Sequence, residues 1–340
     1  MCMSNQPLLS VIIISHNQCD LLRRCINSVL RQRTSFPKEV IVSDDRSTDG
    51  TREMLETEYA NKIITTYCNT DEYNTHYTFE RAGYNRLNGL KKANGKYIIH
   101  IDGDDLFIGD SIFQKQVDVL ETHPECSMCV QNFRIANSDD IEHGEVALSD
   151  SVFKDNPILT VEEFIMQVKY VHNSACCMRR ECLKDSLFIP LEGKSYDDVD
   201  ITYRYLGNKN VALLSRSDFV YVQNPNSFCH TIKSIDWSII SHSELQCVRY
   251  VPHLTYPIIK RRYNSIWALA KMAWKRVPVT ENLIDYFKND DMFIYKVFDN
   301  KYNLINWLRI NAIIIWLIPI RFMGVKNNIS WKVLYKLAIK

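Results

Sequence analysis

The sequence lacks both of the common glycine-rich loops that bind phosphate groups. There is no GxxxxGK[ST] motif, and no GxGxxG follows the first apolar segment, residues 8–15. In those motifs, backbone N–H groups cradle the phosphates of a nucleotide. A nucleotide bound by this chain must therefore be held mainly through side chains and a cation.

An excess of one charge and a long apolar run are also missing. Lys and Arg number 41 against 40 Asp and Glu, so a general positive field is absent and nucleic acid is not an expected partner. The apolar run at residues 312–318 is much too short to span a membrane. The first residues do not resemble a signal peptide, and eleven cysteines are scattered through apolar segments. Together these features predict a protein of the reducing cytoplasm.

The cysteines do not suggest a zinc site. Cys126 and Cys129 form a CxxC pair, but no second ligand pair stands at zinc-like spacing. The surrounding CSMCVQNF is typical of a strand, and cysteine is among the most buried residue types. We predict that these cysteines lie in the core.

The first half of the chain alternates apolar strand-like runs with segments of helical periodicity. The expected strands are residues 8–15, 39–45, 62–68 and 96–101, and the expected helical segments are 19–32, 47–61, 80–94 and 111–124. Such alternation predicts an α/β fold with a Rossmann-like, mostly parallel sheet flanked by helices. Ligands of these folds bind at the carboxyl ends of the strands.

Polar residues follow three of the expected strands. They are Ser15, His16 and Asn17, then Asp44 and Asp45, and finally Asp102, Asp104 and Asp105. Like charges after a buried strand are costly unless a cation compensates them, which indicates a metal site. The alternative is a solvated acidic turn ahead of the next helix. Residues 45–56 also match the spacing of a calcium-binding EF-hand loop, but a strand precedes them where that motif needs a helix.

Five segments, in order, resemble the motifs of family 2 glycosyltransferases, which are inverting enzymes of the GT-A fold. The resemblance covers roughly residues 8–230, about two thirds of the chain. The segments are LLSVIIISHN, CINSVLRQ, EVIVSDDRSTDGT, NRLNGLKKANGKYIIHIDGDD and YDDVDITYR.

This resemblance implies roles for residues at the strand ends. His16 stands where the family usually has a Tyr against the nucleotide base, and Asp45 matches the acid that hydrogen-bonds the base. Arg86 matches an Arg that faces the diphosphate or the base. Asp102 and Asp104 match the DxD pair. Asp104 is expected to ligate Mn²⁺ or Mg²⁺ directly, and Asp102 to contact the ribose or support the metal shell.

The catalytic base is expected in the segment SYDDVDITYRYL, which resembles the family's EDxDLxxR with Asp197 in place of Glu. Asp198 matches the family's catalytic base, which takes the proton of the acceptor hydroxyl. Arg204 could pair with one of the acids of this segment. The alternative is an acid-rich helix start favoured by the helix dipole. Where many relatives carry a metal-binding His, this chain has Asn224. Asn224, His230 or no residue of that loop completes the metal site.

Two regions follow from the resemblance and the composition. Residues 1–230 are expected to form the catalytic domain, with a nucleotide-sugar half at about 8–110 and an acceptor half at about 111–230. Residues 231–340 are expected to form a helical extension. Trp307, Trp316 and Trp331, with Lys and Arg nearby, suit helices lying on a membrane surface. The alternatives are a helical subdomain packed on the catalytic core and a dimer contact.

The expected protein is thus a metal-assisted hexosyl- or N-acetylhexosaminyltransferase at the inner face of the cell membrane. It would use a UDP-linked donor and a hydroxyl of a lipid-carried or polysaccharide acceptor, in cell-envelope polysaccharide biosynthesis. One alternative is a non-catalytic member of the fold that binds nucleotide sugars or scaffolds an assembly. A nucleotidyltransferase is a further one, but it would normally carry a Gly-rich loop with Arg or Lys after the first strand, where this chain has SHNQCD.

Overall fold

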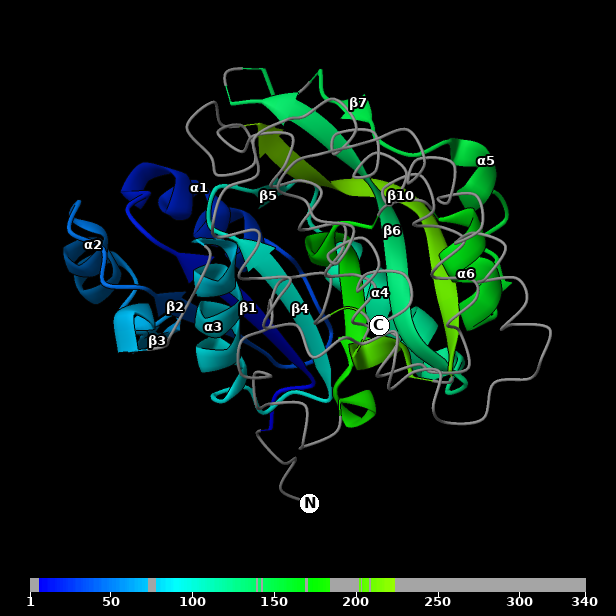
Figure 1. Cartoon of the computed structure of the whole chain (residues 1–340), viewed down its shortest axis with the longest axis horizontal. Coiled ribbons are helices and arrows are strands. Elements are labelled where there is room, and N and C mark those ends of the chain that lie inside the picture. Colours follow the sequence, from blue (N-terminus) through cyan, green and yellow to red (C-terminus); the bar gives the residue numbers. More distant parts are fainter. Residues whose placement is uncertain are drawn as a thin grey trace, which may run out of the picture. The chain divides into compact units, whose positions relative to one another are not determined.

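The computed structural model describes residues 6–72, 78–138, 140–141, 143–168, 171–183, 202, 204–207 and 209–223. Within these residues, ten strands form one sheet (Figure 1). The strands are β1 (Leu9–Ser15), β2 (Lys38–Asp44), β3 (Ile64–Tyr67), β4 (Tyr97–Asp102), β5 (Leu106–Phe107), β6 (Cys126–Asn137), β7 (Glu145–Val146), β8 (Ile158–Leu159), β9 (Cys176–Arg179) and β10 (Asn210–Gln223).

Helices connect most of these strands. They are α1 (Cys19–Leu30), α2 (Thr51–Glu58), α3 (Thr78–Leu90), α4 (Ile112–Thr122), α5 (Asp150–Phe153) and α6 (Val161–Gln167), with 3₁₀ turns η1 (Thr70–Glu72), η2 (Asn173–Ala175) and η3 (Arg180–Cys182). The four expected strands and four expected helices of the first half are all present. The predicted α/β class is confirmed.

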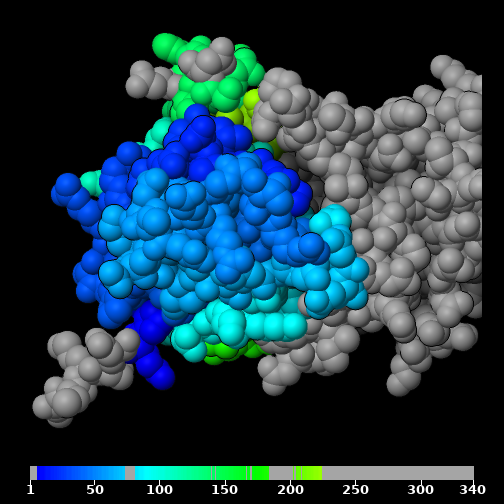
Figure 2. Space-filling view, turned by 90° about the vertical axis from the view of Figure 1, so that its left-hand side faces the viewer, coloured from blue at the N-terminus to red at the C-terminus, as the bar shows by residue number. Residues whose placement is uncertain are grey.

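The sheet order is β3-β2-β1-β4-β9-β6-β10-β5, with β7 on β6 and β8 on β10. The four longest pairings, β1 with β2, β1 with β4, β2 with β3 and β6 with β10, are parallel. β9 runs antiparallel between β4 and β6. This short strand joins the part of the sheet formed by β1–β4 to the part formed by β6 and β10. β3 forms the edge on the side of the molecule that faces the viewer in Figure 2.

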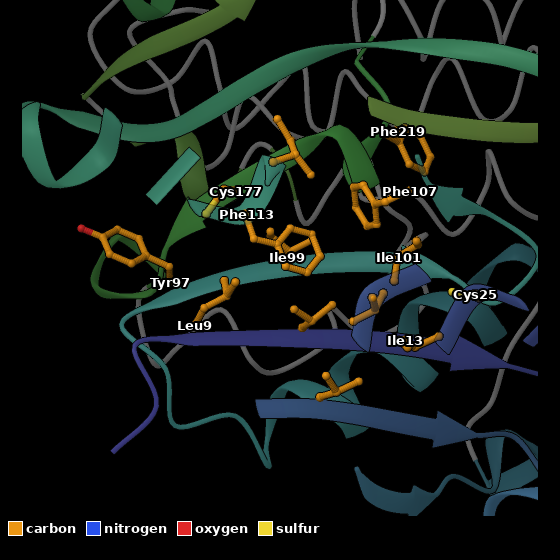
Figure 3. Packing of buried hydrophobic residues seen from close by; sticks show 14 of the residues in the cluster. Leu9, Ile13, Cys25, Tyr97, Ile99, Ile101, Phe107, Phe113, Cys177 and Phe219 are labelled. Carbon is orange, nitrogen blue, oxygen red and sulfur yellow. The ribbon is translucent and has the colours of Figure 1, made fainter. Parts of the chain in front are cut away.

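The two faces of the sheet follow from the alternation of side chains along each strand. Val11 and Ile13 of β1 and Ile99 and Ile101 of β4 point to one face, where they pack with buried residues of α1 and α4 (Figure 3). α3 covers the opposite face. A Cβ on Gly89 of α3 would lie only 2.6 Å from Ile12 Cγ2, so glycine at this position lets the helix approach β1 closely.

The prediction for the cysteines is confirmed. Cys126 and Cys129 are buried, and both are free thiols. Cys129 stands opposite Cys177 in the β6–β9 pairing. Both cysteines of the CxxC pair therefore belong to the core of the sheet, as does Cys177.

The predictions for the last third of the chain lie outside the described residues. These are the domain boundary at residue 230, the helical extension 231–340 and its membrane-facing tryptophans. In the described part of the chain, no helix combines the length and apolar character needed to cross a membrane.

One buried arginine, Arg179, holds the carboxyl end of β9 in place. Arg179 donates hydrogen bonds to Cys126 O (3.0 Å), Leu120 O (2.7 Å) and the Tyr97 hydroxyl (3.2 Å), and only 3% of its surface is exposed. These contacts tie β9 to β4, to the start of β6 and to the end of α4.

Replacement of Arg179 by Leu is expected to lower the free energy of unfolding by about 3 kcal/mol, because buried acceptors lose their donor. Urea unfolding followed by circular dichroism measures the change. Arg180→Leu is the matched control, since in the described part of the chain its side chain makes no hydrogen bond. Equal stability of the two variants would contradict the role of Arg179.

Candidate active site

The loops after β1 and β2 are interlocked. His16 Nδ1 donates to the Asp45 backbone oxygen (2.7 Å), and Asn17 Nδ2 lies 3.2 Å from His16 Nε2. The Asn17 backbone N–H donates to Ser47 Oγ (2.8 Å), and Asn17 Oδ1 accepts from the Thr48 backbone N–H (2.8 Å). The predicted convergence of the first two strand ends is therefore observed. Because a carbonyl oxygen only accepts, the proton of the neutral His16 ring is on Nδ1.

Asp44 and Asp45 have different partners. Asp44 accepts from the Ser47 backbone N–H (2.9 Å) and hydroxyl, which shapes the loop, and burial raises its pKa. Asp45 is 3% exposed. Its carboxylate accepts from the Thr70 backbone N–H (3.1 Å) and hydroxyl, and from Arg81 Nη2 (3.2 Å). The residue predicted to bind the base is thus fixed by η1 and α3.

Arg81 was not singled out from the sequence. Besides Asp45, it pairs with Asp71 at 2.8 Å, and Asp71 also pairs with Arg46 at 2.9 Å. The available signal was its place five residues before Arg86 on the same expected helix. The partners of Arg81 come from the loop after β2 and from η1, and they could not be inferred without the fold.

Arg86 reaches the acidic turn from α3. Its Nη2 atom lies 2.6 Å from Asp102 Oδ1, and the Arg86 side chain is 5% exposed. From the sequence, we expected a metal ion to neutralise the negative charge of these acids. The structure shows that the Arg86 guanidinium neutralises part of that charge. The turn is not a solvated helix cap either, because Asp105 is fully buried and β5 separates the turn from α4.

The glycine between the two acids is required by close backbone contact. The Gly103 N–H donates to Ile14 O at 2.9 Å. A Cβ at this position would lie 2.7 Å from Ile14 O and 2.4 Å from Gln18 Nε2. Cys25 Sγ also donates to Asp102 O at 3.6 Å. The acidic turn is therefore pressed against the end of β1 and the first half of α1.

Among the described residues, Asp104 is the acid of this turn that has no side-chain partner. It is partly exposed, and no side chain in the described residues donates a hydrogen bond to its carboxylate. Desolvation, followed by the charge of Asp102, raises the pKa of Asp104 to about 6. A carboxylate that is costly to ionise and lacks an internal partner is suited to a cationic ligand.

Asp105 and His172 form a second, buried part of the site. Asp105 Oδ1 accepts from the Val222 backbone N–H (2.9 Å), and Asp105 Oδ2 lies 3.8 Å from His172 Nε2. Burial, then the charges of Asp104 and Asp102, raises the pKa of Asp105 well above its usual value. One ligand-type atom each of Asp102, Asp105 and His172 lies within 4.8 Å of the others. His172 was not singled out from the sequence.

The described residues fit a divalent cation of the Mg²⁺ or Mn²⁺ type. Carboxylate oxygens are the hard ligands that these ions prefer. Asp104 offers an uncommitted carboxylate, and Asp105 Oδ2 is buried without a hydrogen-bond partner in the described residues. Whether Asp102 and Asp104 bind the ion as assigned stays a prediction.

The expected base and the third metal ligand lie outside the described residues. This applies to Asp197, Asp198, Asp200, Asn224 and His230. Arg204, expected to pair with one of the acids, is described. It is helical and only 3% exposed.

A second buried histidine lies in β4. His100 is fully buried, and neither ring nitrogen has a hydrogen-bond partner among the residues that the structure describes. It shares its face of the strand with Asp102, two residues on. Desolvation and the nearby Arg86 charge lower the pKa of His100 to about 3, so the ring is neutral at pH 7.

Replacement of His100 by Leu is expected to raise the free energy of unfolding by about 1 kcal/mol, because a buried polar ring without partners gives way to an apolar side chain. Urea unfolding at pH 7 measures the effect. The matched control is Ile98→Leu on the same face of the same strand, which has no polar group to relieve and should not stabilise the protein. If His100→Leu is less stable than the unmodified protein, the imidazole of His100 makes a stabilising interaction and the prediction is wrong.

The architecture is that of known GT-A structures. The crystal structure of Staphylococcus aureus TarS residues 1–349 in complex with UDP-GlcNAc superposes with a TM-score of 0.60 at 19% identity, covering 82% of this chain and 80% of that one. The predicted GT-A fold is confirmed by this similarity. The family model for glycosyl transferase family 2 matches residues 10–186. The chain therefore belongs to glycosyl transferase family 2.

The curated relatives match parts of the chain. An uncharacterized protein of Mycobacterium tuberculosis is 31% identical over 140 residues, which is 40% of this chain and 38% of that protein. TarS of S. aureus, a poly(ribitol-phosphate) beta-N-acetylglucosaminyltransferase, is 26% identical over 218 residues, 62% of this chain and 35% of TarS. The chain thus spans about two fifths of the length of the first of these relatives.

Proposed function

We propose that this protein transfers one sugar from a UDP-linked donor to a hydroxyl of a lipid-carried or polysaccharide acceptor of the cell envelope. The observation that carries the proposal is the convergence of three loops at the ends of β1, β2 and β4. They bring together the Asp45 carboxylate, the Arg86–Asp102 pair and the Asp104 carboxylate, which receives no side-chain hydrogen bond from the described residues. Family membership supports the reaction class.

Each group has a separate task in this proposal. The His16 ring lies against the base, and Asp45 accepts a hydrogen bond from a ring N–H of the base. Arg86 faces the diphosphate and stabilises its negative charge. Asp102 and Asp104 hold a divalent ion, which when bound neutralises the charge that develops on the leaving diphosphate. Asp198 takes the proton of the acceptor hydroxyl as its oxygen attacks the anomeric carbon.

The printed names of the relatives guide the choice of donor and acceptor. TarS is named as an N-acetylglucosaminyltransferase acting on poly(ribitol-phosphate), and one of its crystal structures contains UDP-GlcNAc. TuaG of Bacillus subtilis, 35% identical over 119 residues, is named as a putative teichuronic acid biosynthesis glycosyltransferase. UDP-GlcNAc is therefore the first donor to test, and envelope polymers are the first acceptors.

The deciding experiment is a donor-hydrolysis screen of the purified chain across UDP-, GDP- and TDP-linked sugars, with Mn²⁺, with Mg²⁺ and with a chelator. We expect metal-dependent release of UDP from one UDP-sugar and little from the others. Binding of a UDP-sugar without turnover, with or without acceptors, would instead favour the non-catalytic, scaffolding alternative. Absence of any nucleotide-sugar binding would refute the proposal.

We also propose that the protein lies on the cytoplasmic face of the membrane through its last forty residues. The support is the sequence pattern of Trp307, Trp316 and Trp331 among cationic residues. An envelope acceptor carried on lipid would place the reaction at the same surface.

Four lysines test this location: Lys326, Lys332, Lys336 and Lys340. Changing all four to Glu is expected to abolish flotation with vesicles containing anionic lipid, because each cation near such a surface contributes about 1 kcal/mol. Mn²⁺-dependent UDP binding should stay within about threefold of the unmodified protein, since the proposed donor site lies before residue 230. The matched control changes the same four residues to Arg and should float. If the Glu variant still floats, the tail does not bind through its charge.

A further inference from the structure

We infer that His172 is a positioning residue of the metal-binding turn: its imidazole pairs with Asp105 and so fixes the turn, without binding the ion itself. The inference rests on the proposed function, because it concerns the same site. It departs from the most direct interpretation of the Asp102, Asp105 and His172 cluster, in which the imidazole is a third ligand.

Asp105 connects three segments that are distant in the sequence. Its backbone N–H donates to Asp102 O (3.0 Å), which closes the acidic turn. Its Oδ1 atom accepts from the Val222 N–H (2.9 Å), next to the last residue of β10. Its Oδ2 atom has no hydrogen-bond partner in the described residues and lies 3.8 Å from His172 Nε2, just before η2. A change at Asp105 would therefore be transmitted directly to the turn that carries Asp102 and Asp104.

The hydrogen bonding of His172 argues against a ligand role. The Ser174 backbone N–H lies 3.3 Å from His172 Nδ1 and can only donate to it. A neutral imidazole that accepts at Nδ1 carries its hydrogen on Nε2. Nε2 is the atom nearest to Asp105, and an N–H has no lone pair for a metal. It can, however, donate a hydrogen bond to a carboxylate.

The surroundings hold the ring in place. His172 is 4% exposed. Its ring centroid lies 4.8 Å from that of Phe219, 5.1 Å from Tyr221 and 5.9 Å from Phe133. Two of these rings belong to β10, the strand whose Val222 N–H also binds Asp105. The carboxylate and the imidazole are therefore fixed by the same strand.

The separation of 3.8 Å between Asp105 Oδ2 and His172 Nε2 is longer than a hydrogen bond, but at this distance the Nε2–H attracts the buried carboxylate electrostatically, and a small shift of either group forms the hydrogen bond. Groups that orient a metal ligand without touching the ion typically change metal affinity by about 10- to 100-fold when removed. His172 acts on the metal ligands indirectly, through Asp105, so we expect its removal to change metal-dependent affinity by about 10-fold, the lower end of this range.

Two substitutions in the full-length chain separate packing from hydrogen bonding. His172→Phe keeps an aromatic ring among Phe133, Phe219 and Tyr221 and removes the donor. His172→Gln keeps an N–H donor close to the position of Nε2. The probes are Mn²⁺ and UDP, with affinity measured by calorimetry. We expect His172→Phe to bind UDP about 10-fold more weakly in the presence of Mn²⁺, and His172→Gln to recover to within about threefold of the unmodified protein.

Pulsed electron paramagnetic resonance of the Mn²⁺–UDP complex tests coordination directly. We expect any strong ¹⁴N coupling of a bound imidazole to be the same in the unmodified protein and in His172→Phe, because such a coupling would come from His230 and not from His172. A strong coupling that disappears in His172→Phe would show that His172 is a ligand and overturn the inference. Unchanged UDP affinity in His172→Phe, or a failure of Gln to restore it, would overturn it as well.

Hydrogen exchange of the metal-free protein separates this inference from the proposed function. The Val222 amide should exchange about 10-fold faster in His172→Phe and near the normal rate in His172→Gln. If the unmodified protein binds neither Mn²⁺ nor UDP while Val222 still exchanges faster in His172→Phe, the proposed function is wrong, but the His172–Asp105 pair is confirmed. An exchange rate that does not respond to His172→Phe refutes the pair.

Discussion

Asp104→Asn is expected to weaken Mn²⁺-dependent UDP binding by at least about 100-fold while the protein stays folded. The physical reason is that a carboxylate facing an ion beside a diphosphate contributes a few kcal/mol. The fold should survive because Asp104 is partly exposed and receives no side-chain hydrogen bond from the described residues. Calorimetry with Mn²⁺ and UDP gives the affinity, and urea unfolding gives the stability.

Two controls sharpen this test. Asp110→Asn changes a nearby acid whose partner is Arg33 (3.1 Å) and should bind UDP normally. Asp102→Asn should weaken UDP binding less than Asp104→Asn but destabilise the protein more, because it takes the negative charge from a group 2.6 Å from the buried Arg86 guanidinium. Unchanged Mn²⁺-dependent affinity in Asp104→Asn would move the ion to other residues.

Asp198→Asn is expected to lower turnover by about 100-fold or more and to leave UDP affinity within about threefold. Asn keeps the size of the side chain but cannot accept the proton of the acceptor hydroxyl. The measurement is the rate of sugar transfer at saturating donor, once the screen has identified one, together with calorimetry of UDP.

The neighbouring acids are the matched controls for this variant. Asp197→Asn and Asp200→Asn remove the same charge from the same segment and should retain more than about a tenth of the turnover. If Asp198→Asn transfers at a nearly normal rate and Asp197→Asn does not, Asp197 is the base. If all three are equally impaired, the acids act as a charged group and none is a specific base.

The sequence was sufficient for the features that depend on local patterns. The run 96–101 and its neighbours are continuous apolar segments, so the parallel core and the polar residues at its strand ends could be predicted. The motif resemblance indicated Arg86 and the DxD pair. It did not reveal that these two elements contact one another, because the 2.6 Å pair joins α3 to the end of β4.

Other features arise from long-range pairing, which periodicity does not reveal. β9 is four residues long and antiparallel, and it lies between β4 and β6. Its insertion brings the preceding residues 172–175 beside the acidic turn. The alternation of apolar residues does not specify which strand a short segment joins. For this reason His172 and Arg81 were found only in the structure.

The interlocked loops after β1 and β2 have a consequence for the thermodynamics of donor recognition. His16, Asn17 and Asp45 are already fixed by hydrogen bonds between the two loops and to Thr70. Ordering a free backbone residue costs about 1–2 kcal/mol of conformational entropy, and here folding has already met that cost. The nucleoside should therefore bind to a preorganised site, with rapid association and little backbone rearrangement. Differences in affinity between donors that share the same base should then originate in the sugar.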